Sequence, residues 1–182
     1  MPAPRYLLLI AGIIGVFAMF RPLVGVGRAP LRIQLSAYEL SFGMDRTHRL
    51  LDTKLPRIAE KRLRADWIET RDDIKLVADA SKHAALAFIP AGLILLLGAF
   101  TTWRKRTGRI EGAIAILLGL ASIAAWIGLR YGVWYGAQEE PVLARSHLEL
   151  KWAAHVLLVA GVLAIFAGVQ ALRRVDLPAP ST

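Results

Sequence analysis

Two long apolar runs flank one short basic turn, and this hairpin constrains the fold more than any other feature of the sequence. The runs are Ala84–Phe100 and Ile110–Leu129, and the stretch Trp103–Arg109 between them holds four cations in seven residues. Runs this apolar do not suit the surface of a water-soluble domain, whereas roughly 20 apolar helical residues cross the hydrocarbon core of a bilayer. Cations clustered between two spans indicate a cytoplasmic turn. The sequence therefore predicts a membrane hairpin with its turn in the cytoplasm.

Four apolar blocks along the chain are long enough, or nearly so, to cross a bilayer. Hydrophobic residues make up 55% of the sequence and are segregated into these blocks, whereas a soluble domain mixes them through amphipathic elements. We therefore predict an all-α integral membrane protein with four transmembrane helices. The predicted helices are residues 1–27 (apolar from Tyr6 to Val26), 84–103, 110–130 and 147–174. The remaining segments are an extracytoplasmic module at 28–83, a cytoplasmic turn at 104–109, an outer loop at 131–146 and a cytoplasmic tail at 175–182.

The distribution of charge predicts how the chain is threaded. The short segments on the predicted cytoplasmic side hold seven cations and two acids, so they supply more than half of the net charge of +9. Both termini are then cytoplasmic, and the large first loop is outside. Anionic lipid beside these segments explains the basic character without a nucleic-acid partner. Abundant Ala and the excess of Arg over Lys (17 to 6) are typical of a bacterial protein, so we predict the inner (plasma) membrane and a periplasmic first loop.

The polar segment 28–83 opens with a strand pattern. Apolar and polar residues alternate through Pro30–Ser36, which predicts a strand at about 31–42. A strand needs a partner for its edge hydrogen bonds. We expect it to pair either with the outer loop at Tyr131–Ala144 or with another protein.

A helix is predicted at about 56–83. Apolar positions recur there at alternating spacings of four and three, from Leu63 onward into the second span. We expect this helix to be nearly continuous with the second span and to kink at Pro90. The outer module also supplies the predicted partner-contact residues, which are Leu31, Ile33, Leu35, Tyr38, Trp67, Asp72 and Asp73.

The fourth span opens with a helix-start motif and carries a stripe of small residues. Ser146 and Glu149 fit the S-x-x-E capping box, which predicts that the helix starts at His147. Small residues four apart let helices approach closely in a membrane. The residues predicted to pack against another helix are Ala115 and Gly119 in the third span and Ala160, Ala164 and Gly168 in the fourth.

Catalytic and metal-binding motifs are missing from the sequence. The chain has no cysteine, which excludes disulfides, thiol redox chemistry and Cys-ligated zinc. His83 and His155 lie toward the outer ends of two different spans, where paired imidazoles can ligate a b-type haem. The other interpretation is that each ring lies at the headgroup level or is hydrogen-bonded in the core. We predict no metal site and no small-molecule substrate, and haem b is the one cofactor candidate.

The predicted architecture resembles, in outline, the claudin-type tetraspan proteins. It has four spans, both ends inside, and a long first outer loop that begins with a strand. The chain has neither a cysteine pair nor a G-L-W signature in that loop, so no residue roles are transferred. The resemblance implies an architecture that works through lateral or outer-face protein contacts.

We therefore predict a non-catalytic small integral membrane subunit or scaffold of a larger complex, not an enzyme. Its partners are the lipid bilayer and other membrane protein subunits, contacted through the outer module and the small-residue helix faces. Two alternatives stay open. One is an electron-transfer subunit that holds haem b with His83 and His155, and the other is a small oligomeric channel or transporter component. The second alternative lacks the paired mid-membrane acids that proton and ion pathways usually contain.

Overall fold

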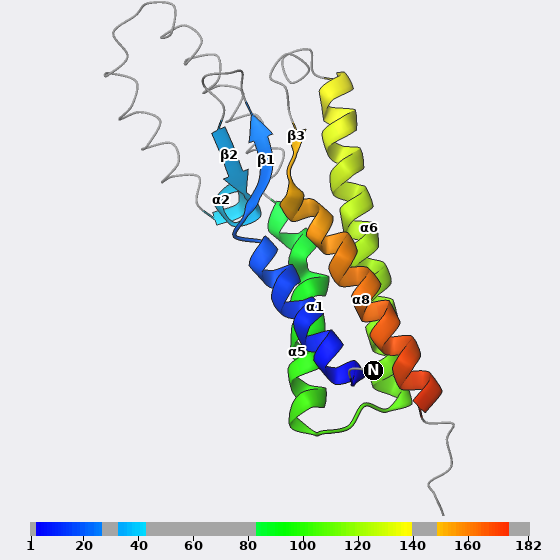
Figure 1. Cartoon of the computed structure of the whole chain (residues 1–182). Helices are drawn as coiled ribbons and strands as arrows, with labels where there is room; N and C mark the ends of the chain where they lie inside the picture. The colour runs from blue at the N-terminus through cyan, green and yellow to red at the C-terminus, as the bar shows by residue number, and fades with distance from the viewer. Residues whose placement is uncertain (1–2, 27–32, 43–82, 140–148, 175–182) are drawn as a thin grey trace, which may run out of the picture. The chain divides into compact units, whose positions relative to one another are not determined.

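The computed structural model describes residues 3–26, 33–42, 83–139 and 149–174 (Figure 1). Contacts divide the chain into two compact units. The bundle unit comprises Met1–Ala18, Ala87–Ile127 and His155–Thr182, and the sheet unit comprises Met19–Leu86 and Gly128–Ala154.

Among the residues that the structure describes, three helices are long and apolar enough to cross a membrane. They cover Ala84–Trp103, Arg109–Tyr135 and Trp152–Arg173. These stretches include the α-helices α5 (Ile89–Trp103), α6 (Arg109–Glu139) and α8 (Trp152–Arg174). The second, third and fourth predicted apolar blocks are thus confirmed as helices of spanning length.

The first predicted span is wrong in its second half. Helix α1 covers only Pro4–Ala18, and Pro22–Val26 form strand β1 instead of completing the span. Fifteen helical residues are about 22 Å long, which is shorter than the ~30 Å hydrocarbon core. Pro22 cannot donate a helical hydrogen bond, and the β-branched Val24 and Val26 beyond it favour a strand.

Helix α5 begins at the proline that was expected to kink it. Residues Ala84–Phe88 form a 3₁₀ turn, η2, and Pro90 lies in the first turn of α5. Proline is favoured there because the first amides of a helix have no intrahelical acceptor. The second span is therefore helical from Ala84, with a 3₁₀ turn in front of Pro90. The predicted helix at 56–83 lies outside the described residues except for His83, which is in a turn, so its continuity with the second span stays a prediction.

Helix α6 continues beyond the predicted end of the third span. The loop predicted at 131–146 is helical through Glu139. Gly132 and Gly136 do not break the helix, since a glycine costs only about 1 kcal/mol relative to alanine in a helix interior. That cost is too small to end a helix that is already formed over many preceding turns.

The described part of the sheet unit holds an antiparallel sheet of three strands in the order β2-β1-β3. Strand β2 (Ile33–Ser36) and strand β3 (Glu149–Leu150) both pair with β1, and Val24 lies opposite Leu35 on one side and Leu150 on the other. The predicted strand at 31–42 is therefore shorter than expected. Its partner is β1, not the outer loop at 131–144.

Two helix starts in the sheet unit differ from the prediction. Glu149 lies in strand β3 and α8 begins at Trp152, so the helix does not start at His147. The amide of Lys151 donates to the Leu23 carbonyl at 2.7 Å, which extends the contact with β1. A capping box is instead formed at Ser36, where helix α2 (Ala37–Phe42) follows β2 directly. The Ser36 amide and hydroxyl both donate to Glu39 Oε2, at 2.9 and 2.8 Å, and the Glu39 amide donates to Ser36 Oγ at 3.2 Å.

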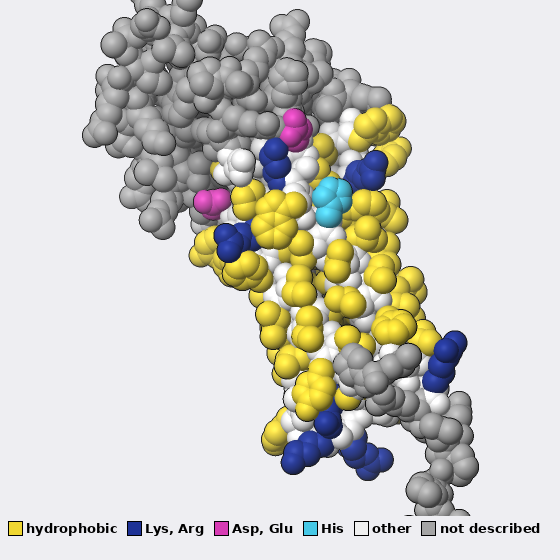
Figure 2. Space-filling view, in the orientation of Figure 1, with side chains coloured by type: hydrophobic (Ala, Val, Ile, Leu, Met, Phe, Trp, Pro, Cys, Tyr) yellow, Lys and Arg dark blue, Asp and Glu magenta, His cyan; other side chains and the backbone are white. Residues whose placement is uncertain are grey.

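The bundle unit is built from two close antiparallel helix pairs, α1 with α5 and α6 with α8 (Figure 1). Its buried core is assembled from one or two side chains of each helix, namely Leu8, Ala11, Ile94, Ala115, Ala164 and Ala167. Large apolar side chains such as Leu96 and Leu117 are exposed on the outside of the same helices. Figure 2 shows hydrophobic side chains along the length of the bundle surface.

Candidate functional site

The contact between α6 and α8 is made by glycines at matched positions. A Cβ added to Gly168 would lie 2.5 Å from the Gly112 carbonyl oxygen, and one added to Gly119 would lie 2.6 Å from the Gly161 carbonyl oxygen. Both spacings are far below van der Waals contact. Two helices therefore meet backbone to backbone at two levels, one heptad apart on each helix.

The residues predicted to pack helices lie in this part of the molecule. Ala115, Ala160 and Ala164 are fully buried, and Gly168 is buried against Gly112. The sequence analysis missed the glycines on the other side of the contact, Gly112 and Gly161. Their signal was present, because Gly112–Gly119 and Gly161–Gly168 have the same seven-residue spacing.

The pair α1 and α5 uses the same construction. A Cβ on Gly12 would lie 2.3 Å from the Leu95 backbone, and one on Gly98 would lie 2.5 Å from the Leu9 amide nitrogen. A Cβ on Gly15 would meet the side chains of Ala91 and Ala160, so α1 also touches α8. Glycine is required at these contacts by close approach of the neighbouring helix, not by its backbone angles.

Two fully buried residues of the bundle, Ser122 and Thr101, bond to helix carbonyls through their hydroxyl groups, whereas the buried Thr102 hydroxyl has no partner among the described residues. Ser122 Oγ donates to the Leu157 carbonyl across the α6–α8 contact at 2.9 Å. Thr101 Oγ1 donates back to Leu97 and Gly98 of its own helix, at 2.9 and 3.1 Å. Each of these hydroxyls is therefore committed to the structure of the bundle.

The two haem candidates lie in different units. His83 is exposed in a turn of the sheet unit, and His155 is exposed on α8 of the bundle unit. His155 Nδ1 accepts a hydrogen bond from Trp126 Nε1 at 3.3 Å, and the two rings are 6.1 Å apart. An indole can only donate, so the ring proton of a neutral His155 resides on Nε2. A histidine that ligates iron through Nε2 carries its proton on Nδ1, so ligation requires this bond to break.

Only some of the predicted partner-contact residues are described. Leu31, Trp67, Asp72 and Asp73 lie outside the described ranges. Ile33 belongs to β2, and Leu35 is buried in the core of the sheet unit instead of lying on its surface. Tyr38 is exposed between two other exposed aromatic rings, 5.3 Å from Phe20 and 5.7 Å from Phe42. We call Phe20, Tyr38 and Phe42 the aromatic patch.

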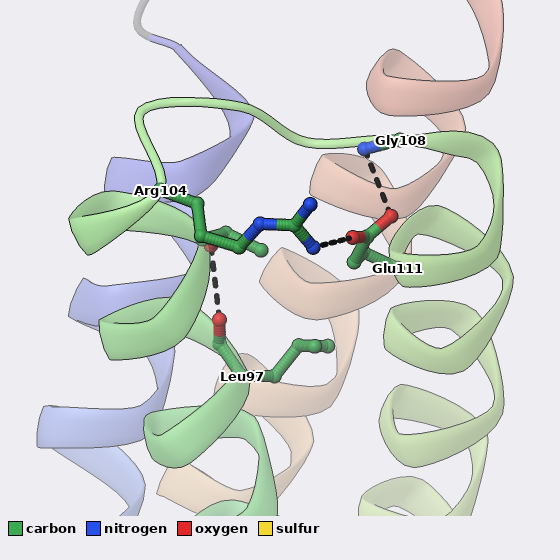
Figure 3. Close-up of polar contacts among 5 residues, drawn as sticks. Leu97, Arg104, Gly108 and Glu111 are labelled. Atoms are coloured by element: carbon green, nitrogen blue, oxygen red, sulfur yellow. Dashed lines mark hydrogen bonds and ion pairs between the residues drawn. The ribbon is translucent and has the colours of Figure 1, made fainter.

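The basic turn at 104–109 is held by one acid at the start of α6. Glu111 Oε2 accepts from the Gly108 amide at 3.0 Å, and Glu111 Oε1 pairs with Arg104 Nη1 at 3.5 Å (Figure 3). A glutamate in the first turn of a helix is favoured by the helix dipole. Glu111 therefore joins Arg104, the residue that follows α5, to the start of α6.

The same turn is tied to α1 by an arginine. Arg5 Nη1 donates to the Lys105 carbonyl at 2.8 Å, and the Arg5 guanidinium lies 4.9 Å from the centre of the Tyr6 ring. Lys105 has a φ of +52°, a left-handed conformation that is uncommon for a residue other than glycine. A pocket of about 230 Å³ lies here, lined by Ala3, Pro4, Arg5, Lys105, Thr107 and Ala171.

Within the described ranges, no group of three His, Asp or Glu side chains is placed to hold a metal ion. No family model, no curated protein and no solved structure matches this chain. The candidate features of the described part are thus the close helix contacts, the aromatic patch and the basic end of the bundle.

Proposed function

We propose that this chain is a non-catalytic integral membrane subunit or scaffold of a larger membrane complex. Its apolar helices anchor it in the bilayer, and an extracytoplasmic module meets the partner. The observation that carries the proposal is the backbone-to-backbone packing of α6 on α8 at Gly112–Gly168 and Gly119–Gly161. Helices in direct contact leave no room between them for a flat cofactor or a water-filled path.

Two buried hydroxyl groups support the same function. The hydroxyl groups of Ser122 and Thr101 donate hydrogen bonds to helix carbonyls. A proton or ion pathway needs polar groups that can exchange partners. The hydrogen bond from Trp126 to His155 Nδ1 likewise favours a structural histidine over a haem ligand. A rigid anchor is the simplest role for a bundle of this kind.

The aromatic patch is the surface that we propose for the partner. Its three rings are exposed, and Tyr38 contacts the other two; exposed aromatic clusters are typical of protein interfaces. We propose that both termini and the turn at 104–109 are cytoplasmic and that the sheet unit is on the outside. The four cations of that turn support this orientation.

Gentle purification from native membranes tests the proposal. We expect other membrane proteins to copurify, an absorbance spectrum without a Soret band, and no ion flux through liposomes that contain the chain alone. A Soret band that disappears in His155→Ala would instead assign the haem function, and flux through liposomes would assign a channel.

A substitution in the aromatic patch locates the contact. Phe42→Ser removes the most exposed ring of the patch, and we expect it to reduce copurification of the partner without changing membrane insertion. Tyr135→Ser is the matched control, because it removes an exposed ring of the sheet unit outside the patch. Equal recovery of the partner by Phe42→Ser and the wild type would contradict the proposed surface.

A further inference from the structure

We propose that the pocket at the basic end of the bundle unit binds the phosphate of an anionic phospholipid headgroup. The pocket joins three parts of the bundle, which are the start of α1, the turn at 104–109 and the last turns of α8. Its volume of about 230 Å³ is several times the ~30 Å³ that one water molecule occupies in the liquid. A phosphate group therefore fits with some of its water.

The pocket wall supplies donors and positive charge. Arg5 and Lys105 contribute two cations, and Thr107 contributes a hydroxyl group. Two donors of the Arg5 guanidinium are used by the Lys105 carbonyl and the Tyr6 hydroxyl, at 2.8 and 3.4 Å. Both of these acceptors are neutral, so the charge of Arg5 has no counterion among the residues that the structure describes. A phosphate oxygen supplies one.

One donor of this arginine has no acceptor in the described part of the chain. The Arg5 Nε atom is buried, and nothing among the described residues accepts its hydrogen bond. A buried N–H of a charged group is costly when unpaired. An anion in the pocket that Arg5 lines removes this cost, and a guanidinium suits a phosphate because its N–H groups match two oxygens at once.

The position of the pocket identifies the source of the phosphate. It lies between the start of α1, the basic turn and the last turns of α8, in a bundle whose helices are long enough to cross a bilayer. Figure 2 shows Lys and Arg side chains gathered at one end of the bundle, next to its hydrophobic surface. Basic pockets between membrane helices at this level bind lipid headgroups. The backbone at Lys105 fits the same role, since its left-handed conformation places a cation in a turn where glycine would be less strained.

Native mass spectrometry of the full chain in a mild non-ionic detergent tests the site. The probes are phosphatidylglycerol, phosphatidylcholine and inorganic phosphate. We expect the wild type to retain phosphatidylglycerol in preference to phosphatidylcholine. Arg5→Gln should weaken this binding about tenfold, which is the value of one charge-assisted hydrogen bond. Lys105→Gly should weaken it about fivefold, as expected for the loss of one cation near a headgroup.

Two features of the design separate binding from folding and from general charge. Glycine is compatible with the φ of +52° at position 105, so Lys105→Gly removes the cation while the turn keeps its shape. Arg106→Gln is the matched control, because it removes a cation of the same turn that does not line the pocket, and it should change binding less than twofold.

Three results would overturn the site. Equal loss of phosphatidylglycerol in Arg106→Gln and Lys105→Gly would reduce it to a general charge effect. Equal retention of phosphatidylglycerol and phosphatidylcholine by the wild type would remove the need for an anionic headgroup. Displacement of the lipid by inorganic phosphate would assign a free phosphate as the ligand.

Discussion

The bundle unit and the sheet unit differ in how closely their backbones approach. Each unit buries large aliphatic side chains almost completely, which are Leu8, Ile94 and Leu157 in the bundle and Leu23, Leu35 and Leu40 in the sheet unit. In the bundle, alanine and glycine add direct contact between helix backbones, as where Gly119 meets Gly161 and where Ala115 and Ala164 lie buried. Close backbone contact thus accompanies aliphatic burial in the bundle, whereas aliphatic burial fills the core around the strands of the sheet unit.

The difference matches two different solvents. Lipid tails are as apolar as leucine, so burying leucine between membrane helices brings little gain, and close packing of small residues takes over. In water, burial of one leucine contributes about 1.5–3 kcal/mol, and large side chains are favoured. The bundle surface is consistent with a lipid environment, since Leu96 and Leu117 are each 66% exposed. We infer that the bundle helices are surrounded by lipid and that the core of the sheet unit is the kind formed in water.

The largest expected effect comes from filling a glycine contact in the bundle. Gly168→Leu places a side chain where the Gly112 carbonyl and Ile116 already lie. Overpacking costs about 1–3 kcal/mol or more, and here the helix backbones themselves must separate, so we expect at least about 3 kcal/mol of lost stability with normal membrane insertion. SDS-induced unfolding in mixed micelles measures this loss.

Gly92→Leu is the matched control for that change. An added Cβ at Gly92 meets nothing within 4 Å, although the residue also lies in a bundle helix. We expect its unfolding to stay close to that of the wild type. Similar stability of Gly168→Leu and the wild type would place α8 away from α6.

The next largest effect is expected in the sheet unit. Leu35→Ala removes a side chain that is 2% exposed and should cost about 3 kcal/mol, because the cavity adds to the lost burial. Hydrogen exchange of the amides at 23–26 and 33–36 measures the loss. Gln34→Ala on the exposed side of the same strand is the control. Comparable exchange in the two variants would mean that Leu35 is not a core residue.

A smaller effect is expected at the capping box. Ser36→Ala removes the hydroxyl that accepts the Glu39 amide, and loss of such a cap costs about 1 kcal/mol. Faster exchange of the Glu39 amide is the readout. Glu39→Gln keeps an oxygen that accepts from Ser36, so it should cost less than Ser36→Ala, and the reverse order would contradict the assignment.

The smallest effect is expected for the hydrogen bond between the membrane helices. Ser122→Ala removes the bond to the Leu157 carbonyl. Interhelical hydrogen bonds in membranes contribute about 0.6 kcal/mol on average, so SDS unfolding should shift only slightly. A loss as large as that of Gly168→Leu would show that hydrogen bonding, not close packing, holds α6 to α8.

Apolar length predicted the three long helices because a bilayer requires about 20 consecutive apolar residues. It failed at Pro22–Val26, since a short apolar run suits a strand as well as a helix. The S-x-x-E motif occurs at both Ser36 and Ser146, but only Glu39 caps a helix while Glu149 lies in a strand. Pairing of β3 with the distant strand β1 keeps Glu149 out of a helix. The local sequence around the motif does not reveal this pairing.

The helix contacts and the basic end of the bundle were predicted only in part, because the sequence shows local patterns but not distant contacts. The small residues of the fourth span were visible as a periodic stripe, and the cations of the turn as a cluster. The bond from Arg5 to the Lys105 carbonyl joins residues 100 positions apart. Such a contact follows from the antiparallel packing of α1 on α5, which the sequence alone did not specify.

Single-cysteine labelling in intact membranes tests the two-solvent interpretation most directly. The chain has no cysteine of its own, so Leu96→Cys, Leu117→Cys and Gln34→Cys each introduce one thiol at an exposed position. A water-soluble maleimide should label Gln34→Cys and leave Leu96→Cys and Leu117→Cys unmodified, because lipid covers them although no protein does. Rapid labelling of all three thiols would contradict a bundle surrounded by lipid.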